Sequence, residues 1–258
     1  MFTIATWNIN SLRVRLPYVL DWLQQHQPDV LALQELKLPN EDFPLSVFQD
    51  VGYHAAFSGQ KTYNGVAVLS RKPASQPMTD IANLQDPQRR ILGVTIHDIR
   101  IINLYVPNGE SVDSEKYKYK LGWLAKMTDF LAKEIKKHAK VLVVGDFNIA
   151  PEECDVHDPL LWKGQVLFSE PERRAFQAIL QQGLVDCFRL HDQSAKEFTW
   201  WDYRMNAFKR NRGLRIDHIL ASQSLAAHCQ RCYIDKTPRA GERPSDHVPV
   251  VAEFACCP

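Results

Sequence analysis

The stretch KVLVVGDFNIAP, residues 140–151, joins the most apolar run of the chain to two polar side chains. Its apolar residues 141–144 lead into Gly145, after which come Asp146 and Asn148. A short apolar run of this kind is typical of a buried strand. Asp and Asn are common turn residues after a strand, but a rigid strand end can also hold them toward a reaction. The stretch alone predicts the strand and leaves the role of the two polar residues open.

Length and composition are those of a soluble globular protein. The chain has 258 residues, of which 45% are apolar and 24% charged, and its formal net charge is +1. The overall charge therefore does not indicate a nucleic-acid binder, although local basic patches could still bind one. The N-terminus lacks the features of a signal peptide, and no apolar run is long enough to span a bilayer. No linker divides the sequence, and we expect a single domain, residues 1–258, in the cytoplasm.

Six cysteines raise the question of a metal site or disulfides: Cys154, Cys187, Cys229, Cys232, Cys256 and Cys257. Cys229 and Cys232 form a C-x-x-C pair, but the other close pair, Cys256–Cys257, is adjacent. A structural zinc site normally uses two well-spaced pairs, so the spacing argues against zinc. Reduced thiols in a reducing compartment are the better interpretation.

The rest of the chain repeats one unit, a short apolar or β-branched run that meets polar residues at one end. These runs predict strands within residues 2–10, 29–37, 65–72, 91–109, 140–148, 214–222 and 245–254, with a hairpin inside 91–109. Helical spacing of apolar residues predicts helices from Pro17 to before Pro28, over 115–138, and over 172–182 with Gly183 as the stop. Strands outnumber helices, so we expect an α/β fold of two mixed sheets packed face to face with helices on the outside.

The predicted strands carry eight polar residues at or near their ends: Asn8, Glu35, Tyr105, Asp146, Asn148, Asp217, Asp246 and His247. Four of these are hard oxygen ligands of the kind that Mg²⁺ or Mn²⁺ prefers: Glu35, Asp146, Asn148 and Asp246. Asp217 lies in an apolar strand, where an unpaired carboxylate is costly, and a bond to the ring of His247 would satisfy it. Tyr105 and the amides can donate hydrogen bonds to a phosphate without adding charge.

Taken singly, these residues have ordinary explanations. Glu35 could be a solvated strand end, and Asn8 could cap a helical turn near Ser11. Asp217 fits such an explanation least well, because the neighbouring Ile216 indicates burial. The joint identity of the eight residues favours a functional site.

Eight segments, in this order, resemble the exonuclease III family and the related apurinic/apyrimidinic endonucleases: TWNIN, LQELK, NGVAVLSR, GDFNIAP, GLVDCFR, FTWWDYR, NRGLRIDHILAS and PSDHVPV. The likeness runs from residue 3 to about 254. It implies a four-layer α/β sandwich and a magnesium-dependent phosphodiesterase, with Mn²⁺ as a possible substitute, acting on double-stranded DNA. Transferred by position, Glu35 would be the main metal ligand, with Asn8 beside it and Asp246 helping from the other side.

The same resemblance implies roles for the remaining polar residues. His247, oriented by Asp217, would activate water or stabilise the phosphorane-like transition state. Asp146 would handle a proton of the nucleophile or the leaving group, and Asn148 would position the attacking water. Tyr105 would contact the scissile phosphate. On this interpretation Asp146 and Asn148 are two residues apart because one strand end directs both at the same phosphate.

Basic segments around these motifs point to DNA as the substrate. FKRNRGLR supplies Lys209, Arg210, Arg212 and Arg215; EKYKYK, residues 115–120, interleaves lysines with Tyr117 and Tyr119; Lys61, Arg89 and Arg90 add to them. We expect a monomer that binds duplex DNA with abasic sites or with blocked or recessed 3′ ends. Two alternatives are a phosphatase of the same superfamily acting on inositol phosphates or lipids, and a DNA-binding relative without catalysis. The second is disfavoured because every expected catalytic position is filled.

Specificity is expected to depend on four further residues. In the relatives, the positions of Trp200, Leu214 and Ile216 form an aromatic and apolar pocket for a flipped-out sugar without its base. A core position explains Ile216 equally well. Leu167 stands where many abasic-site endonucleases have Gly or Ser, and a bulky side chain there could obstruct the extrahelical sugar. We therefore expect 3′-end processing to be retained and abasic-site incision to be weakened.

Overall fold

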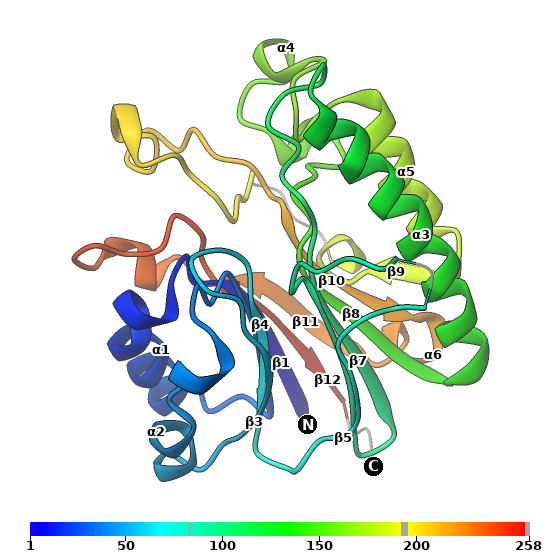
Figure 1. Ribbon diagram of the computed structural model, residues 1–258. Helices are drawn as coiled ribbons and strands as arrows, with labels where there is room; N and C mark the ends of the chain where they lie inside the picture. Colours follow the sequence, from blue (N-terminus) through cyan, green and yellow to red (C-terminus); the bar gives the residue numbers. More distant parts are fainter. Residues whose placement is uncertain (83, 192–195, 256–258) are drawn as a thin grey trace.

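Two six-stranded β-sheets pack face to face in the computed structural model, which describes residues 1–82, 84–191 and 196–255 (Figure 1). In spatial order, the first sheet consists of β11 (Cys229–Ile234), β12 (Val250–Phe254), β1 (Phe2–Asn8), β2 (Val30–Gln34), β4 (Val66–Ser70) and β3 (His54–Ser58). The second consists of β5 (Ser75–Met78), β6 (Ile91–Ile96), β7 (Ile99–Tyr105), β8 (Lys140–Asp146), β10 (Asp217–Ser222) and β9 (Leu184–Asp186).

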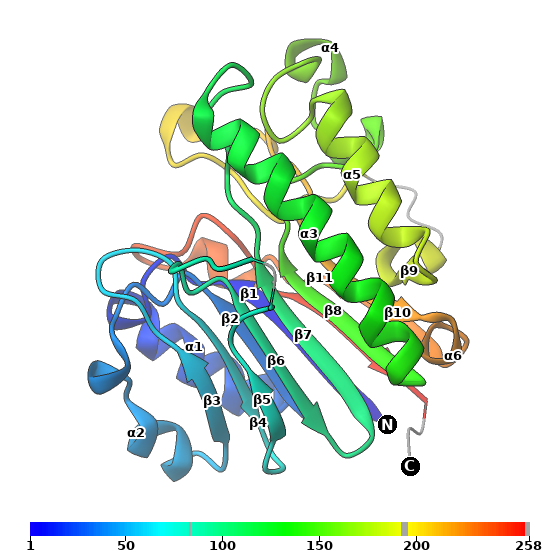
Figure 2. The same cartoon turned by 45° about the vertical axis from the view of Figure 1, so that its right-hand side comes forward.

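Helices cover the outer face of each sheet and complete four layers (Figure 2). Helices α1 (Leu12–His26) and α2 (Leu45–Asp50) pack on the first sheet, and α3 (Glu115–Lys137) and α5 (Glu170–Leu180) on the second. The short helices are α4 (Pro159–Trp162), α6 (Gln223–Ala226), η1 (Asn40–Asp42), η2 (Glu153–Asp155), η3 (Cys187–Leu190), η4 (Arg204–Asn206) and η5 (Thr237–Ala240). The fold expected from the sequence, two mixed sheets face to face with helices outside, is confirmed.

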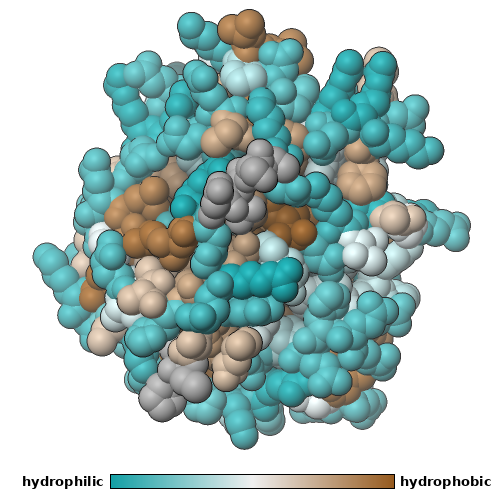
Figure 3. Space-filling model, turned by 180° about the vertical axis from the view of Figure 1, so that it is seen from behind, coloured by the Kyte–Doolittle hydropathy of each residue, from teal (hydrophilic) through white to brown (hydrophobic). Residues whose placement is uncertain are grey.

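The apolar run of β8 shows how the layers are built. Leu142 and Val144 point into the core between the sheets, whereas Val141 and Val143 point into the core beneath α3 and α5. Because side chains alternate along a strand, a run buried on both faces is apolar throughout. No helix among the described residues is long and apolar enough to cross a membrane. The face seen in Figure 3 is mostly hydrophilic with small hydrophobic patches.

The strands that carry the predicted site residues meet at one rim of the two sheets. β1 runs parallel to β2, and β7 runs parallel to β8, so all four end there. β10 is antiparallel to β8, which places Asp217 at its start opposite Asp146 at the end of β8. β12 is antiparallel to β1, so the segment before it, which contains His247, reaches the end of β1. The topology therefore brings distant parts of the sequence to one place.

Two kinds of sequence-based prediction differ from the structure. The first helix begins at Leu12 rather than at Pro17, because Leu12 is buried in the core while Pro17 is exposed and interrupts the hydrogen bonding only once. Four strands were not predicted: β3, β5, β9 and β11. All four are the edges of the two sheets. Edge strands are short or half exposed, so they lack the apolar pattern that identified the central strands.

Candidate active site

The end of β8 is fixed by a close contact with β7. Gly145 has a φ of +140°, and a Cβ atom there would lie 1.9 Å from the carbonyl oxygen of Leu104. Only glycine fits, because any side chain would force the two strands apart. The next residue, Asp146, pairs with Tyr105 on β7 and is 1% exposed. The glycine of the GDFN segment thus sets the position of Asp146.

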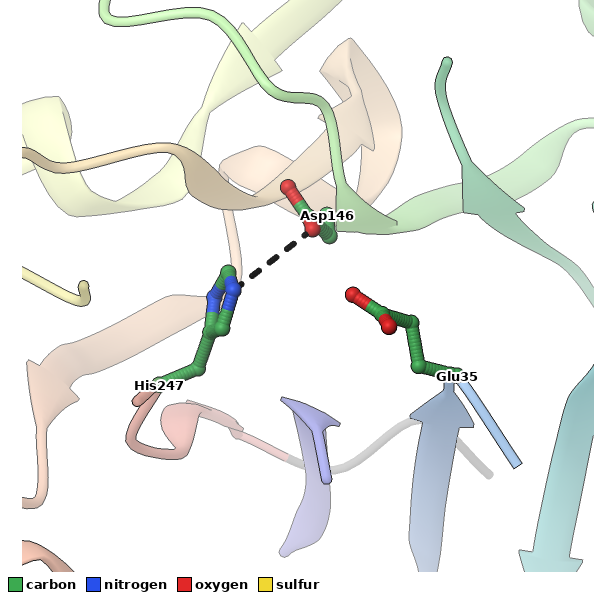
Figure 4. A group of neighbouring side chains, drawn as sticks. All are labelled: Glu35, Asp146 and His247. Carbon is green, nitrogen blue, oxygen red and sulfur yellow. Dashed lines mark ion pairs between the residues drawn. The ribbon is translucent and has the colours of Figure 1, made fainter. Parts of the chain in front are cut away.

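Asp217, His247 and Asp146 form a line of polar contacts beside this strand end, of which Figure 4 shows the contact between His247 and Asp146. Nδ1 of His247 lies 2.9 Å from Oδ2 of Asp217, which is the contact expected from the sequence. Nε2 of the same ring lies 3.8 Å from Oδ2 of Asp146. The other oxygen of Asp217, Oδ1, is buried and receives no hydrogen bond from any described residue. A buried carboxylate with an unused acceptor is costly, and such groups concentrate at functional sites.

The charges of this line shift the pKa values of its members. Burial lowers the pKa of His247, but the carboxylates of Asp217 and Asp146 outweigh it and raise the pKa well above the usual 6.5. For Asp146 burial acts in the other direction: it raises the pKa of the carboxyl, and the opposing effect of His247 is smaller. The ring is therefore positively charged at neutral pH, and the Asp146 carboxyl can exchange a proton closer to neutrality than an exposed aspartate.

Asn8 and Glu35 complete the group from the first sheet. Asn8 ends β1, and its Nδ2 donates to Oε1 of Glu35 at 2.8 Å and to Oδ2 of Asp146 at 2.9 Å. Glu35 follows β2 in a left-handed conformation, φ +54°, and its Oε2 lies 2.9 Å from Nζ of Lys37. Asn8 does not cap the first helix, whose N-cap is Ser11. It bridges two carboxylates instead.

Glu35, Asp146 and His247 form a possible metal site, since one ligand atom from each lies within 4.8 Å of the others (Figure 4). Asp246, expected to bind the metal from the other side, is not in this group. Its oxygens accept hydrogen bonds from Nδ2 of Asn10 at 2.9 Å and Nε1 of Trp200 at 3.0 Å. Each carboxylate oxygen can accept more than one bond, so these contacts leave room for an ion, and Asp246 as a metal ligand stays a prediction.

Asn148 and Tyr105 lie next to Asp146. The backbone N–H of Asn148 donates to Oδ1 of Asp146 at 2.8 Å, and its side-chain Oδ1 accepts from Nδ2 of Asn108 at 3.1 Å. Burial and the neighbouring Glu35 raise the pKa of Tyr105 well above 10. The tyrosine therefore keeps its proton and can donate it in a hydrogen bond. The guanidinium of Arg90 lies 4.6 Å from the centre of the Tyr105 ring.

Three residues of this neighbourhood were not among the predicted site residues: Asn10, Asn108 and Thr199. Asn10 contacts Asp246 and Lys37, Asn108 contacts Asn148, and Oγ1 of Thr199 accepts from the backbone of Asp217 at 3.1 Å. Asn108 follows a predicted strand, so the signal used for the others could have found it. No pattern in the sequence indicated Thr199, because its contact with the backbone of Asp217 forms only when the chain folds.

The basic residues expected to contact DNA fall into two groups. Lys209, Arg210 and Arg212 are exposed in the loop before β10. Lys61 and Arg89, which lie in other loops, are also exposed. Arg215 is 1% exposed, and its guanidinium is bonded to Asp155 and Asp186. Within EKYKYK, Lys120 is fully buried against Glu172. The expected DNA contacts of Arg215 and Lys120 are therefore wrong.

The four specificity residues lie in one apolar cluster. Leu214 is fully buried, Ile216 is 1% exposed and Leu167 is 5% exposed, while Trp200 is half buried above them. Leu214 and Ile216 are thus buried among the residues packed with Trp200, as the core explanation of Ile216 predicted, and their part in a pocket for the sugar stays a prediction. Leu167 adopts a φ of +75°, a left-handed conformation that costs a leucine about 1–2 kcal/mol.

Comparison with known proteins agrees with this geometry. The model of the endonuclease/exonuclease/phosphatase family matches residues 5–247. The chain is 38% identical to exodeoxyribonuclease III of Haemophilus influenzae over 96% of this chain and 98% of that protein. A solved structure of the 3′ phosphatase NExo from Neisseria, bound to a product DNA hairpin, has 46% identity and a TM-score of 0.97 over 99% and 100% of the two chains. An AP endonuclease from Archaeoglobus fulgidus has 42% identity and a TM-score of 0.96 over the same shares.

Proposed function

The chain belongs to the endonuclease/exonuclease/phosphatase family and is a DNA repair nuclease of the exodeoxyribonuclease III type, and we propose that it hydrolyses phosphate esters at the 3′ ends of duplex DNA. The family expected from the sequence is thus confirmed. The observation that supports the proposed chemistry best is the line from Asp217 through His247 to Asp146, which ends beside Glu35. The alternative function, that of a phosphatase of the same superfamily acting on inositol phosphates or lipids, is the weaker of the two.

The donor set suits a hard divalent cation, and we propose Mg²⁺, with Mn²⁺ as a substitute. Glu35 and Asp146 offer carboxylate oxygens that lie close together. Glu35 would hold the ion with Asn8 beside it, and Asp246, which accepts hydrogen bonds from Asn10 and Trp200, would help from the other side. When bound, the ion would neutralise negative charge on the phosphate.

The side chains divide the remaining work. His247, kept protonated by Asp217, stabilises the negative charge that develops on the phosphoryl oxygens. Asp146, with its raised pKa, takes the proton of the attacking water. Asn148 positions that water, and the protonated hydroxyl of Tyr105 donates to the phosphate. In this assignment Asp146, and not His247, is the base, because an imidazolium cannot accept a proton.

The DNA lies, in this proposal, across the rim where the loops carry exposed basic residues. Lys209, Arg210 and Arg212 are exposed in the loop that leads to β10. A groove of about 560 Å³ is lined by Arg90, by Asn108, which contacts Asn148, and by other residues. Phosphates bound at both places would carry the strand past Asp146. We further propose that the protein acts as a monomer in the cytoplasm.

Leu167 is proposed to bias the enzyme toward 3′ ends. Its side chain fills space beneath Trp200, packed with Leu214 and Ile216, which a Gly or Ser would leave open. A frayed 3′ terminus can reach the phosphate site from the side, whereas an extrahelical abasic sugar needs the filled space. Abasic-site incision is therefore retained only weakly.

Product analysis on defined substrates tests the proposal. The substrates are duplexes with a 3′-phosphate, a recessed 3′ end or an internal abasic site, together with an inositol phosphate, each with Mg²⁺ and with excess chelator. We expect rapid release of phosphate and nucleotides from 3′ ends, slower abasic incision, and no activity in chelator. Hydrolysis of the inositol phosphate without attack on DNA would contradict the proposed substrate, and full activity in chelator would contradict the metal site.

A further inference from the structure

Three cysteines and a histidine meet at the side of the molecule, apart from the candidate active site. Cys187 begins η3 directly after β9, His191 follows η3, and Cys229 and Cys232 lie in β11. Cys187 and Cys232 belong to the core between the sheets, and Cys229 packs against it. No disulfide joins the cysteines that the structure describes; residues 256–257, the adjacent pair noted in the sequence, lie outside the described residues.

A β-bulge explains why both cysteines of the C-x-x-C pair face the core. Cys229 lies opposite Phe254 and Cys232 opposite Ala252, with a register shift between Cys229 and Arg231. Residues three apart in a regular strand point to opposite faces, but the extra residue of a bulge turns both to the same face. The sequence spacing alone would have predicted that one of them faces solvent.

Cys229 has two partners that favour its deprotonated form. Cys187 and Cys229 pack at the same core cluster, where η3 contacts β11, and Nε2 of His191 lies 3.7 Å from the Cys229 sulfur. The neighbouring Cys187 thiol and, to a smaller extent, His191 lower the pKa of Cys229 to about 6, although burial opposes the shift. The neighbouring Cys229 and burial raise the pKa of Cys187, so it remains a thiol. The pair therefore consists of a thiolate next to a protonated thiol.

Exposure and geometry make the pair suited to oxidation rather than to metal binding. Cys229 is half buried and accessible, whereas Cys187 is fully buried behind it. Within the described parts of the chain, Glu35, Asp146 and His247 are the residues that bring three ligand atoms within 4.8 Å of one another, and the thiols do not. Reactive, redox-sensitive cysteines are accessible thiolates beside a second cysteine that can close a disulfide.

We propose that Cys229 is an oxidation site whose thiolate reacts with a hydroperoxide, after which Cys187 closes a Cys187–Cys229 disulfide. The thiolate attacks one peroxide oxygen, the O–O bond breaks, and a sulfenic acid forms while hydroxide leaves. The sulfur loses two electrons, which reduce the peroxide. The sulfur of Cys187 then attacks that of Cys229, the S–OH bond breaks, and the hydroxide leaves with the thiol proton as water. With hydrogen peroxide, two thiols yield one disulfide and two waters.

The disulfide would join the two sheets at one side. β11 is an edge of the first sheet, and η3 follows β9, an edge of the second. A bond between them closes a long loop of the chain and restricts the unfolded state. We therefore expect the oxidised protein to melt at a temperature higher by about 5 °C or more.

The test treats the reduced full-length protein with hydrogen peroxide and locates the products by mass spectrometry without reduction. We expect the Cys187–Cys229 disulfide, the rise in melting temperature, and neither in Cys229→Ser. Cys187→Ala should stop at the sulfenic acid of Cys229, trapped as a dimedone adduct. Cys154→Ser is the matched control, because Cys154 is exposed and contacts Arg189; this variant should behave like the wild type.

Several outcomes would overturn the proposal. These are oxidation of Cys154 as fast as that of Cys229, a disulfide to Cys232 in place of Cys187, or no dimedone adduct in Cys187→Ala. Cooperative thermal melting of each reduced variant shows that it is folded. Because the oxidation chemistry does not use the active site, a failure of the proposed DNA substrate would leave this test unaffected.

Discussion

The segment from Arg215 to Asp217 joins two buried clusters of charged side chains that differ in how their charges are balanced. Arg215 donates to Asp155 at 2.6 Å and to Asp186 at 2.8 Å, and Arg189 adds a second cation to Asp155. Burial raises the pKa of Asp155, but Arg215 outweighs it, and the net pKa is below the usual value. Around Asp217, by contrast, several carboxylates face His247, and one oxygen has no described partner.

The contrast separates structural from chemical roles. In the Arg215 cluster, each ion has an opposite ion and hydrogen bonds to it, and the charge of Arg215 holds the pKa of Asp155 below its usual value. In the Asp217 cluster, burial raises the pKa of Asp146 more than His247 lowers it, and the carboxylates of Asp217 and Asp146 raise the pKa of His247 against the effect of burial. Perturbed pKa values and unused acceptors are typical of sites that bind ions or move protons. Variants in the two clusters should therefore affect different properties, activity in one and stability in the other.

The largest effect is expected in the active site. His247→Ala and Asp217→Ala should each lower kcat by about a thousandfold or more, and the double variant should lose little further, because residues that act as a unit are not additive. Single-turnover hydrolysis of a 3′-phosphate duplex measures the loss, and thermal melting shows that the fold is intact. Independent, multiplied losses would show that the two residues do not work as a pair.

The second cluster should respond through stability. Arg215→Met leaves buried Asp186 without its arginine and Asp155 with Arg189 alone, and should lower the free energy of unfolding by about 3–5 kcal/mol. Denaturant unfolding measures this change. Arg212→Met, three residues away and exposed, is the matched control and should change stability by no more than about 0.5 kcal/mol. Similar losses in both variants would remove the distinction between the buried and the exposed arginine.

The Arg215 cluster also predicts a dependence of stability on pH. Burial and the charge of Arg215 lower the pKa of His218 to about 4, from 6.5. The unfolded chain gains this proton as pH falls through 6.5, while the folded chain resists it until about pH 4, so stability is lost across that window. The contribution of His218 is about 3 kcal/mol. Comparing unfolding of the wild type and His218→Phe at pH 7 and pH 4.5 isolates it, with exposed His54→Gln as the control. Equal pH dependence in all three would contradict a neutral, buried His218.

These clusters also show what the sequence could and could not predict. The central strands and the residues at their ends were predicted, because buried strands have a continuous apolar pattern and strand ends bring their polar residues together. Arg215 and Lys120 were misassigned to the DNA surface. Their partners Asp155 and Glu172 lie 60 and 52 residues away in the chain, and no local pattern reveals such a pairing.

The edge strands and the oxidation site were missed for a related reason. β11 is partly exposed and contains a bulge, so neither its strand pattern nor the shared face of Cys229 and Cys232 is visible in the sequence. The hydrogen bonds that Asp246 accepts from Asn10 and Trp200 could not be predicted either, because these three residues meet only in the folded chain.

Variants of the exposed basic loop before β10 should change DNA binding rather than catalysis or stability. Changing Lys209, Arg210 and Arg212 together to Gln should flatten the dependence of duplex binding on salt, since each lost phosphate contact removes about 0.9 from the slope of log affinity against log salt. Fluorescence anisotropy between 50 and 200 mM salt measures the slope. Hydrolysis of a small phosphodiester should be unchanged, because none of the three touches Asp146 or His247. An unchanged slope would place the DNA on another face.

The smallest effect is expected at Leu167, which contacts a third buried group of charges, the pair of Glu172 and Lys120. Its N–H donates to Oε1 of Glu172 at 3.0 Å, and Glu172 pairs with buried Lys120, whose Nζ also donates to the carbonyl of Asn148 at 2.7 Å. The backbone at Leu167 is thus held by a balanced ion pair that also supports the active site. Leu167→Gly should keep this backbone, because glycine adopts a φ of +75° without strain.

Leu167→Gly therefore removes only the side chain beneath Trp200. Stability should fall by about 2 kcal/mol, because the lost apolar contacts outweigh the relieved strain. Abasic-site incision should rise about tenfold relative to 3′-end trimming, since the emptied space admits the extrahelical sugar and one such steric contact is worth about 1.4 kcal/mol. Leu167→Ala is the control: it empties nearly the same space but keeps the strained conformation. If neither variant changes the ratio of the two activities, Leu167 does not control access to the site, and its left-handed leucine serves the packing of the loop alone.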